Sequence, residues 1–112
     1  MPLAWGEWVR RVRHDLVKRL LWPARDRRDM GGPVRPGELV AALLDDEGAP
    51  ATAEAVWADL RAAAPAPEHP ALGAFEPALL AALAAARADD LAGVLALEAA
   101  FDRLIEDLAG ET

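Results

Sequence analysis

Cysteine, serine and tyrosine are absent from this sequence of 112 residues, and threonine occurs only as Thr52 and Thr112. Without cysteine the chain has no disulfide, no thiolate metal site and no thiol nucleophile. The shortage of hydroxyl groups argues equally against a hydroxyl nucleophile. The two histidines, His14 and His69, stand far apart along the chain. We therefore predict a protein that is not an enzyme and that holds no metal or cofactor.

Long apolar segments are also missing. The longest apolar run ends at Ala86 and is far shorter than the roughly 20 residues that cross a bilayer. The first residues lack the apolar region of a signal peptide and include Glu7 and Asp15. Together with the absence of cysteine, these features predict a cytoplasmic protein. The heavy use of Ala, Arg, Leu and Asp is typical of GC-rich bacterial genomes.

Alanine and leucine dominate the composition, whereas β-branched residues are few. Alanine and leucine favour helices, and β-branched residues favour strands. A chain of 112 residues fits a single domain with one core. We predict an all-α fold, a compact bundle of four to five helices that combines a long N-terminal helix with two αα-hairpins.

The N-terminal helix is expected over residues 3–21. Its apolar positions recur every three or four residues and predict one buried stripe, formed by Trp5, Val9, Val12, Leu16 and Leu20. Pro23 is expected to end or kink this helix at Trp22. Residues 24–30 add a short helical extension, which Gly31 and Gly32 terminate.

The first hairpin is expected over residues 36–64, with helices over 36–47 and 51–64. Pro36 suits the first helical turn, Gly48 is the expected C-cap and Thr52 the expected N-cap. The predicted apolar faces are Leu39, Val40, Leu43 and Leu44 in the first helix and Val56, Trp57 and Leu60 in the second. The acidic cluster Asp45–Glu47 is interpreted as a solvated helix end, because its spacing does not match a metal site.

The second hairpin is expected over residues 75–109, with helices over 75–88 and 90–109 and Asp89 as the N-cap between them. The last helix shows a heptad seam of Val94, Leu97, Phe101, Leu104 and Leu108. Residues 65–73 contain three prolines and are interpreted as an extended connector, with His69 in an exposed loop.

Charge is unevenly distributed along the chain. Residues 1–30 hold eight basic and four acidic side chains, a formal charge of +4, whereas residues 31–112 hold four and fifteen, a charge of −11. Together they give the net charge of −7. Such asymmetry indicates either an interaction surface or a basic helix whose charges pair with the acidic body.

The basic N-terminal helix carries more large apolar residues than one stripe needs, since Trp8, Val17, Leu21 and Trp22 lie beside or off it. Exposed Trp next to Arg is typical of interface hot spots, although the same Trp residues could serve as core anchors. We predict an adaptor or regulatory protein that binds another protein or a second copy of itself. The candidate partner-binding residues are Trp5, Trp8, Arg10, Arg11, Lys18, Trp22, Arg25, Arg27 and Arg28.

His14 is the one residue that suggests chemistry. It falls opposite the apolar stripe, and an acid, Asp15, and then Leu16 follow it. This segment resembles the phosphoacceptor segment of histidine kinases and histidine phosphotransferases, which implies a nucleophilic His14 with Asp15 as its base. Arg19 stands where the kinases usually have proline. An alternative function is therefore a histidine phosphotransfer module.

A second alternative is a nucleic-acid or membrane-surface binder that uses the N-terminal helix. Its Arg, Lys and Trp residues suit phosphate, base or headgroup contacts. The charge of −11 over residues 31–112 disfavours both, because it repels phosphate and anionic lipid.

Overall fold

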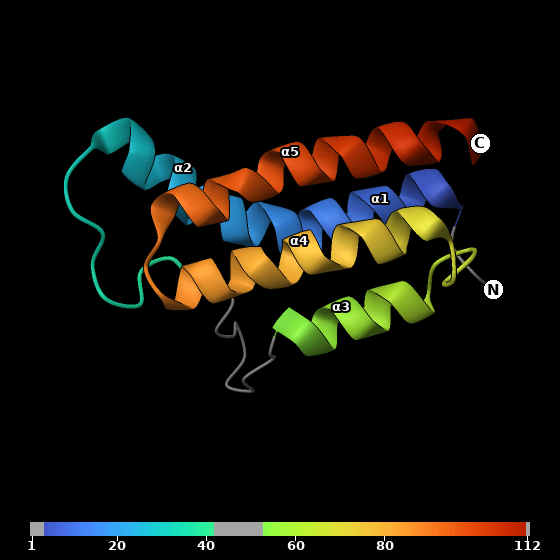
Figure 1. Ribbon diagram of the computed structural model, residues 1–112, viewed down its shortest axis with the longest axis horizontal. Helices are drawn as coiled ribbons and strands as arrows, with labels where there is room; N and C mark the ends of the chain where they lie inside the picture. The colour runs from blue at the N-terminus through green and yellow to red at the C-terminus, as the bar shows by residue number, and fades with distance from the viewer. Residues whose placement is uncertain (1–3, 42–52, 112) are drawn as a thin grey trace.

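Figure 1 shows the computed structural model, which describes residues 4–41 and 53–111. These ranges are helical without a strand, so the all-α prediction is confirmed. The elements are α1 (Trp5–Val12), the π-helical turn η1 (Arg13–Val17), α2 (Lys18–Met30), α3 (Ala53–Ala62), α4 (Pro70–Arg87), α5 (Leu91–Leu108) and the 3-10 turn η3 (Ala109–Glu111). None of the described helices is both long enough and apolar enough to cross a membrane.

The helices form a flat bundle of 42 × 30 × 19 Å. Helices α4 and α5 run antiparallel, which confirms the second predicted hairpin (Figure 1). The segments α1, η1 and α2 are continuous and form one long helix, whose second half packs against α5 and whose first half packs against α3. The long helix and the α4–α5 hairpin therefore bury a common core.

The long helix runs well beyond its predicted end at residue 21. Pro23 lies inside α2, and the helix continues to Met30. Of the two outcomes predicted for Pro23, an end of the helix was wrong, because the neighbouring side chains of Leu20, Leu21 and Ala24 are buried and hold the backbone in place. Their packing offsets the hydrogen bond that proline removes. The helical extension predicted over residues 24–30 is confirmed as the second half of α2. The predicted stop at Gly31 is confirmed by its left-handed φ of 74°.

The π-turn explains which side chains of the long helix are buried. Its fully buried positions repeat every four residues, at Trp8, Val12, Leu16, Leu20 and Ala24. Four α-helical residues turn by about 400°, so such a stripe drifts by about 40° at each step. In η1 the Lys18 N–H donates to the Arg13 carbonyl, five residues earlier. This wider turn contains one extra residue, which reduces the accumulated drift of the stripe by about 100°. Val17 and Leu21 consequently face the core, and Trp22 faces solvent.

In the first predicted hairpin, the second helix is present as α3, whereas the first helix does not begin at Pro36 as expected. Residues 36–40 form turns, because Gly37 has a φ of 77° and cannot continue a helix from Pro36. Leu39 is nevertheless buried, as predicted. The predicted features at Leu43, Leu44, Asp45–Glu47, Gly48 and Thr52 lie outside the described residues.

Helix α4 begins earlier than predicted, inside the segment interpreted as a connector. Pro70 occupies its first turn, and the His69 Nδ1 accepts a hydrogen bond from the Ala71 N–H at 3.0 Å. The His69 Nε2 lies 2.7 Å from the Glu111 carboxylate, and the Trp5 ring meets the imidazole edge-on at 5.5 Å. With a side chain only 19% exposed, His69 is a helix cap and not an exposed loop residue.

The cap of α5 is displaced by one residue from the prediction. Asp90, not Asp89, accepts a hydrogen bond from the Gly93 N–H at the start of α5. Asp89 instead adopts a left-handed φ of 56° at the end of α4. Its carboxylate is then free to accept a hydrogen bond from the Gly37 N–H at 3.0 Å. The turn between α4 and α5 thus holds the loop that follows α2.

The core contains a chain of aromatic contacts through the bundle. Trp8 meets Trp57, Trp57 meets Phe75 and Phe75 meets Phe101, with ring centroids 5.5–6.2 Å apart. The buried Trp8 Nε1–H donates to the Leu60 carbonyl at 2.6 Å. This bond satisfies the indole and joins the long helix to α3.

Candidate functional site

The outer face of the long helix presents a basic–Trp stripe, which we define as Arg11, His14, Lys18 and Trp22. These side chains are all exposed and follow one another at spacings of three or four residues. Trp22 is 66% exposed, whereas Trp8 is 0% exposed. Of the tryptophans predicted to bind a partner, Trp22 is therefore the one that the fold presents to solvent.

Two surface hollows flank Trp22 and share Lys18 as a wall. The first, of about 420 Å³, is lined by His14, Lys18, Arg19 and Trp22. The second, of about 400 Å³, lies between the long helix and α5 and is lined by Arg13, Val17, Lys18, Leu21, Trp22, Arg25, Glu98, Phe101 and Asp102. A partner side chain placed beside Trp22 would find room on either side of the indole.

Trp5 and Trp8, the other two tryptophans of the long helix, pack toward the core. Trp8 lies within the bundle, so it cannot meet a partner without unfolding. Trp5 is half-buried and contacts Trp8 edge-on at 5.6 Å. Both residues were predicted partner contacts, and the structure places them away from the stripe because they pack around α3 and His69.

Several predicted partner-binding arginines are ion-paired within the chain. Arg25 lies 2.8 Å from Glu98 of α5, and Arg28 lies 3.2 Å from Asp29. Arg27 makes a two-pronged contact with Glu38. The basic helix is thus partly neutralised by acids of the same chain, in line with one of the two interpretations of its charge.

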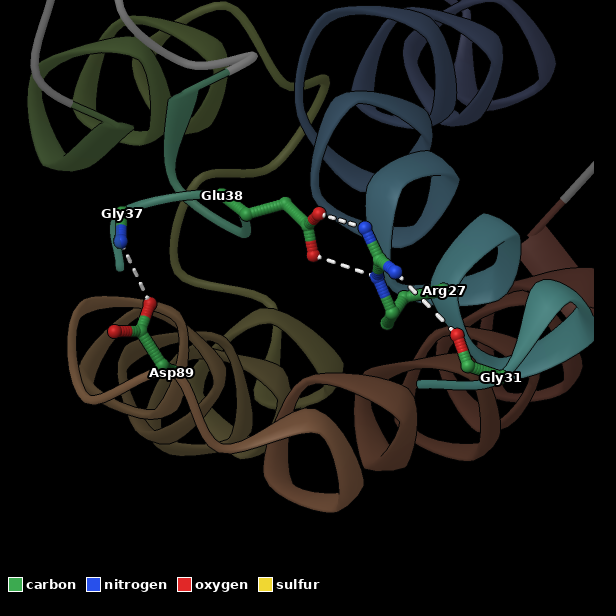
Figure 2. Close-up of polar contacts among 5 residues, drawn as sticks. All are labelled: Arg27, Gly31, Gly37, Glu38 and Asp89. Atoms are coloured by element: carbon green, nitrogen blue, oxygen red, sulfur yellow. Dashed lines mark hydrogen bonds and ion pairs between the residues drawn. The ribbon is translucent and has the colours of Figure 1, made fainter. Parts of the chain in front are cut away.

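Arg27 and Glu38 hold the loop after α2 in place, as Figure 2 shows. The Arg27 Nε–H donates to Glu38 Oε2 at 2.9 Å, and its Nη1 donates to the Gly31 carbonyl at 3.3 Å. The hydrogen bond from Arg27 lowers the pKa of the Glu38 carboxyl, and Glu38 in turn raises the pKa of Arg27. With Gly37 tied to Asp89, this contact set fixes the loop to α2 and to the α4–α5 turn. Arg27 is therefore a structural residue.

Two other cations of the long helix, Arg11 and Lys18, are available for contacts with a partner. Across residues 4–41 and 53–111, Arg11 and Lys18 make no ion pair. Arg10 donates only to the Gly6 carbonyl of its own helix, at 3.4 Å. Arg13 lies over the Phe101 ring, 5.5 Å from its centroid. The positive charge of the long helix that is not neutralised by ion pairs within the chain therefore lies around His14 and Lys18.

His14 and Asp15 are in direct contact, as the alternative function requires. The His14 Nδ1 lies 2.9 Å from Asp15 Oδ1, and the His14 side chain is 73% exposed. Both residues belong to η1, which the buried Leu16 and Val17 anchor to the core. In the part of the chain that the structure describes, no cluster of three acidic or histidine side chains could hold a metal ion.

Sequence reasoning missed the part of the site that α5 contributes. Glu98, Phe101 and Asp102 line the second hollow, because α2 packs against α5. No local pattern signals this contact, since it depends on how two distant helices meet.

Comparisons with protein-family models, curated proteins and solved structures found no match.

Proposed function

We propose that this chain is a non-enzymatic helical adaptor of the cytoplasm that binds an acidic segment of another protein through the basic–Trp stripe. The observation that carries the proposal is the exposure of Trp22 between two hollows and beside Lys18. Trp flanked by cations is a frequent composition of binding hot spots.

Covering Trp22 supplies apolar binding energy. An indole buries about 150–250 Å² when fully enclosed, and each Å² contributes about 25 cal/mol. Two-thirds of that area remains open on Trp22. A partner that covers the ring would gain on the order of 3 kcal/mol from this side chain.

Charge indicates the chemistry of the partner. Arg11 and Lys18 make no ion pair within the described parts of the chain. A partner segment with Asp or Glu beside an apolar residue would complement them and would place the apolar residue against Trp22. We therefore favour an acidic amphipathic segment as the occupant.

A second copy of the chain fits the stripe less well. A two-fold symmetric dimer on this face would bring two copies of the same basic surface together, so that the cations of one copy lie near those of the other. A head-to-tail contact with the acidic body would avoid that repulsion, but it would add further copies until a ring closes or an open chain grows. A different protein meets neither difficulty.

Nucleic acid and membrane also fit the stripe less well. Glu98 and Asp102 line one hollow beside Trp22, and the evenly spaced phosphates of a nucleic acid would have to pass these carboxylates. A short acidic segment can instead place its carboxylates beside Arg11 and Lys18 and its apolar residue in that hollow. A membrane-surface helix must insert its apolar face, and that face of the long helix is buried in the core.

The proposal is tested with the full chain as bait in a lysate of the native host. Four variants accompany the wild type: Trp22→Ala and Lys18→Glu in the stripe, with Leu80→Ala and Arg103→Glu as exposed controls on α4 and α5. A captured protein is purified and titrated against each chain. We expect Trp22→Ala to weaken binding roughly 30-fold and both controls to leave it unchanged.

Three outcomes would overturn the proposal. Equal binding by Trp22→Ala and Leu80→Ala would place the interface elsewhere. Capture that nuclease treatment abolishes would indicate nucleic acid, and capture of the chain alone would indicate self-association. Far-UV circular dichroism of each variant checks that helicity is retained.

A further inference from the structure

We propose that His14 is a phosphorylation site that accepts a phosphoryl group on Nε2 from an acyl phosphate. The inference is independent of the adaptor function, because it rests on the His14–Asp15 geometry and on the charges around it. His14 is 73% exposed, so a phosphoryl donor can reach it.

The contact with Asp15 fixes the tautomer of His14. A carboxylate can only accept, so the hydrogen atom between the His14 Nδ1 and Asp15 Oδ1, 2.9 Å apart, belongs to the imidazole. The ring therefore keeps its proton on Nδ1 and has its lone pair on Nε2. This nitrogen is the nucleophile that the proposal needs.

The surroundings of His14 suit a phosphoryl group. Lys18 lies one helical turn along the same face, and both side chains line the hollow of about 420 Å³. In the described ranges Lys18 has no carboxylate partner, so its ammonium group can neutralise phosphoryl oxygens. The hollow has space for the donor, and the helix holds His14 on a rigid element.

The reaction balances with an acyl phosphate as co-reactant. The Nε2 lone pair attacks phosphorus, the N–P bond forms, and the bond between phosphorus and the acyl oxygen breaks. The electron pair leaves with the acyl oxygen, which departs as a carboxylate. The proton stays on Nδ1, where Asp15 stabilises the positive charge that develops on the ring.

His69 provides a matched comparison within the same chain. Its Nδ1 accepts from the Ala71 N–H, so the proton lies on Nε2 and points to Glu111 at 2.7 Å. Neither nitrogen of His69 offers a free lone pair, and the ring is only 19% exposed. The two histidines therefore differ in tautomer, exposure and charge environment, and only His14 is expected to react.

The test incubates the full chain with radiolabelled acetyl phosphate. We expect an acid-labile, alkali-stable label that is lost in His14→Gln and retained in His69→Gln. Asp15→Asn should slow labelling by roughly tenfold or more, since an amide orients the ring less firmly. Phosphorus-coupled NMR of the labelled chain should place the group on Nε2 of His14.

The rate in the folded chain is compared with the rate in urea, where both histidines are equivalent. Labelling of His14 that is no faster when folded than in urea would overturn the proposal, as would equal labelling of His69 or attachment at Nδ1. Leu80→Ala, an exposed change on α4 outside this hollow, should be labelled like the wild type. The label is measured without any protein partner, which separates this site from the docking function.

Discussion

The long helix and the α4–α5 hairpin use their surfaces differently. In the hairpin the two helices approach so closely that a Cβ on Gly93 would lie 2.6 Å from the Ala85 Cβ. The polar side chains at the start of each hairpin helix, His69 and Asp90, act as helix caps.

The long helix buries its inner face in the core, whereas its outer face exposes Trp22 beside Lys18. Leu80, a large apolar side chain that the hairpin exposes, is 43% open to solvent, compared with 66% for Trp22. This difference supports the outer face of the long helix as the proposed binding surface.

The largest expected effect separates the two faces of the long helix by their tryptophans. Trp8→Ala should lower the free energy of unfolding by about 3–5 kcal/mol, because it opens a cavity in the core. Trp22→Ala should change it by less than about 0.5 kcal/mol. Urea unfolding followed by circular dichroism measures both. Similar losses would mean that Trp22 also belongs to the core.

A milder change removes the hydrogen bond of Trp8 together with only part of its ring. Trp8→Phe keeps an aromatic ring but leaves the Leu60 carbonyl without its donor. We expect a loss of about 1–3 kcal/mol, the usual cost of a buried polar group without a partner. A stability equal to that of the wild type would show that water replaces the indole.

Two glycines sharpen the comparison between the hairpin and the long helix. Gly93→Ala should destabilise the chain by about 1–3 kcal/mol, since the new methyl group collides with Ala85. Gly6→Ala meets no atom within 4 Å and should stabilise α1 by about 0.5 kcal/mol. Thermal unfolding of both variants is the measurement. The same sign for both would contradict the difference in packing.

The smallest expected effect concerns the loop that joins the two regions. The hydrogen bond from Arg27 lowers the pKa of Glu38 in the folded chain, so the ionised carboxylate stabilises the fold. This contribution is present above the unfolded pKa and is lost as pH falls through the lower, folded pKa. Wild type and Glu38→Gln should therefore differ at neutral pH and converge as the pH falls below the folded pKa of Glu38.

Urea unfolding across that pH range tests the prediction, with Glu106→Gln on the exposed side of α5 as the control. A difference between wild type and Glu38→Gln that is independent of pH would exclude the ion pair as its source.

The sequence predicted those features that local periodicity determines. The heptad seam from Val94 to Leu108 is buried along α5, and His14 faces solvent as its helical position indicated. These outcomes depend on neighbours within the same helix. Side-chain spacing is sufficient to predict them.

Features that depend on contacts between distant segments were not predictable. A uniform helical wheel placed Val17 and Leu21 at the edge of the stripe, because it contains no π-turn. The burial of His69 depends on Trp5 and on Glu111 of η3, which contact it from opposite ends of the chain. The pairing of Arg27 with Glu38 likewise removed a predicted partner-binding residue from the candidate site.

The proposed role of Trp22 as the anchor of a protein partner is tested most directly by a titration of the purified partner. Isothermal calorimetry would compare the wild type, Trp22→Ala and the control Leu80→Ala, all with unchanged helicity. We predict a roughly 30-fold loss of affinity for Trp22→Ala and none for Leu80→Ala. Equal affinities for all three chains would contradict the claim.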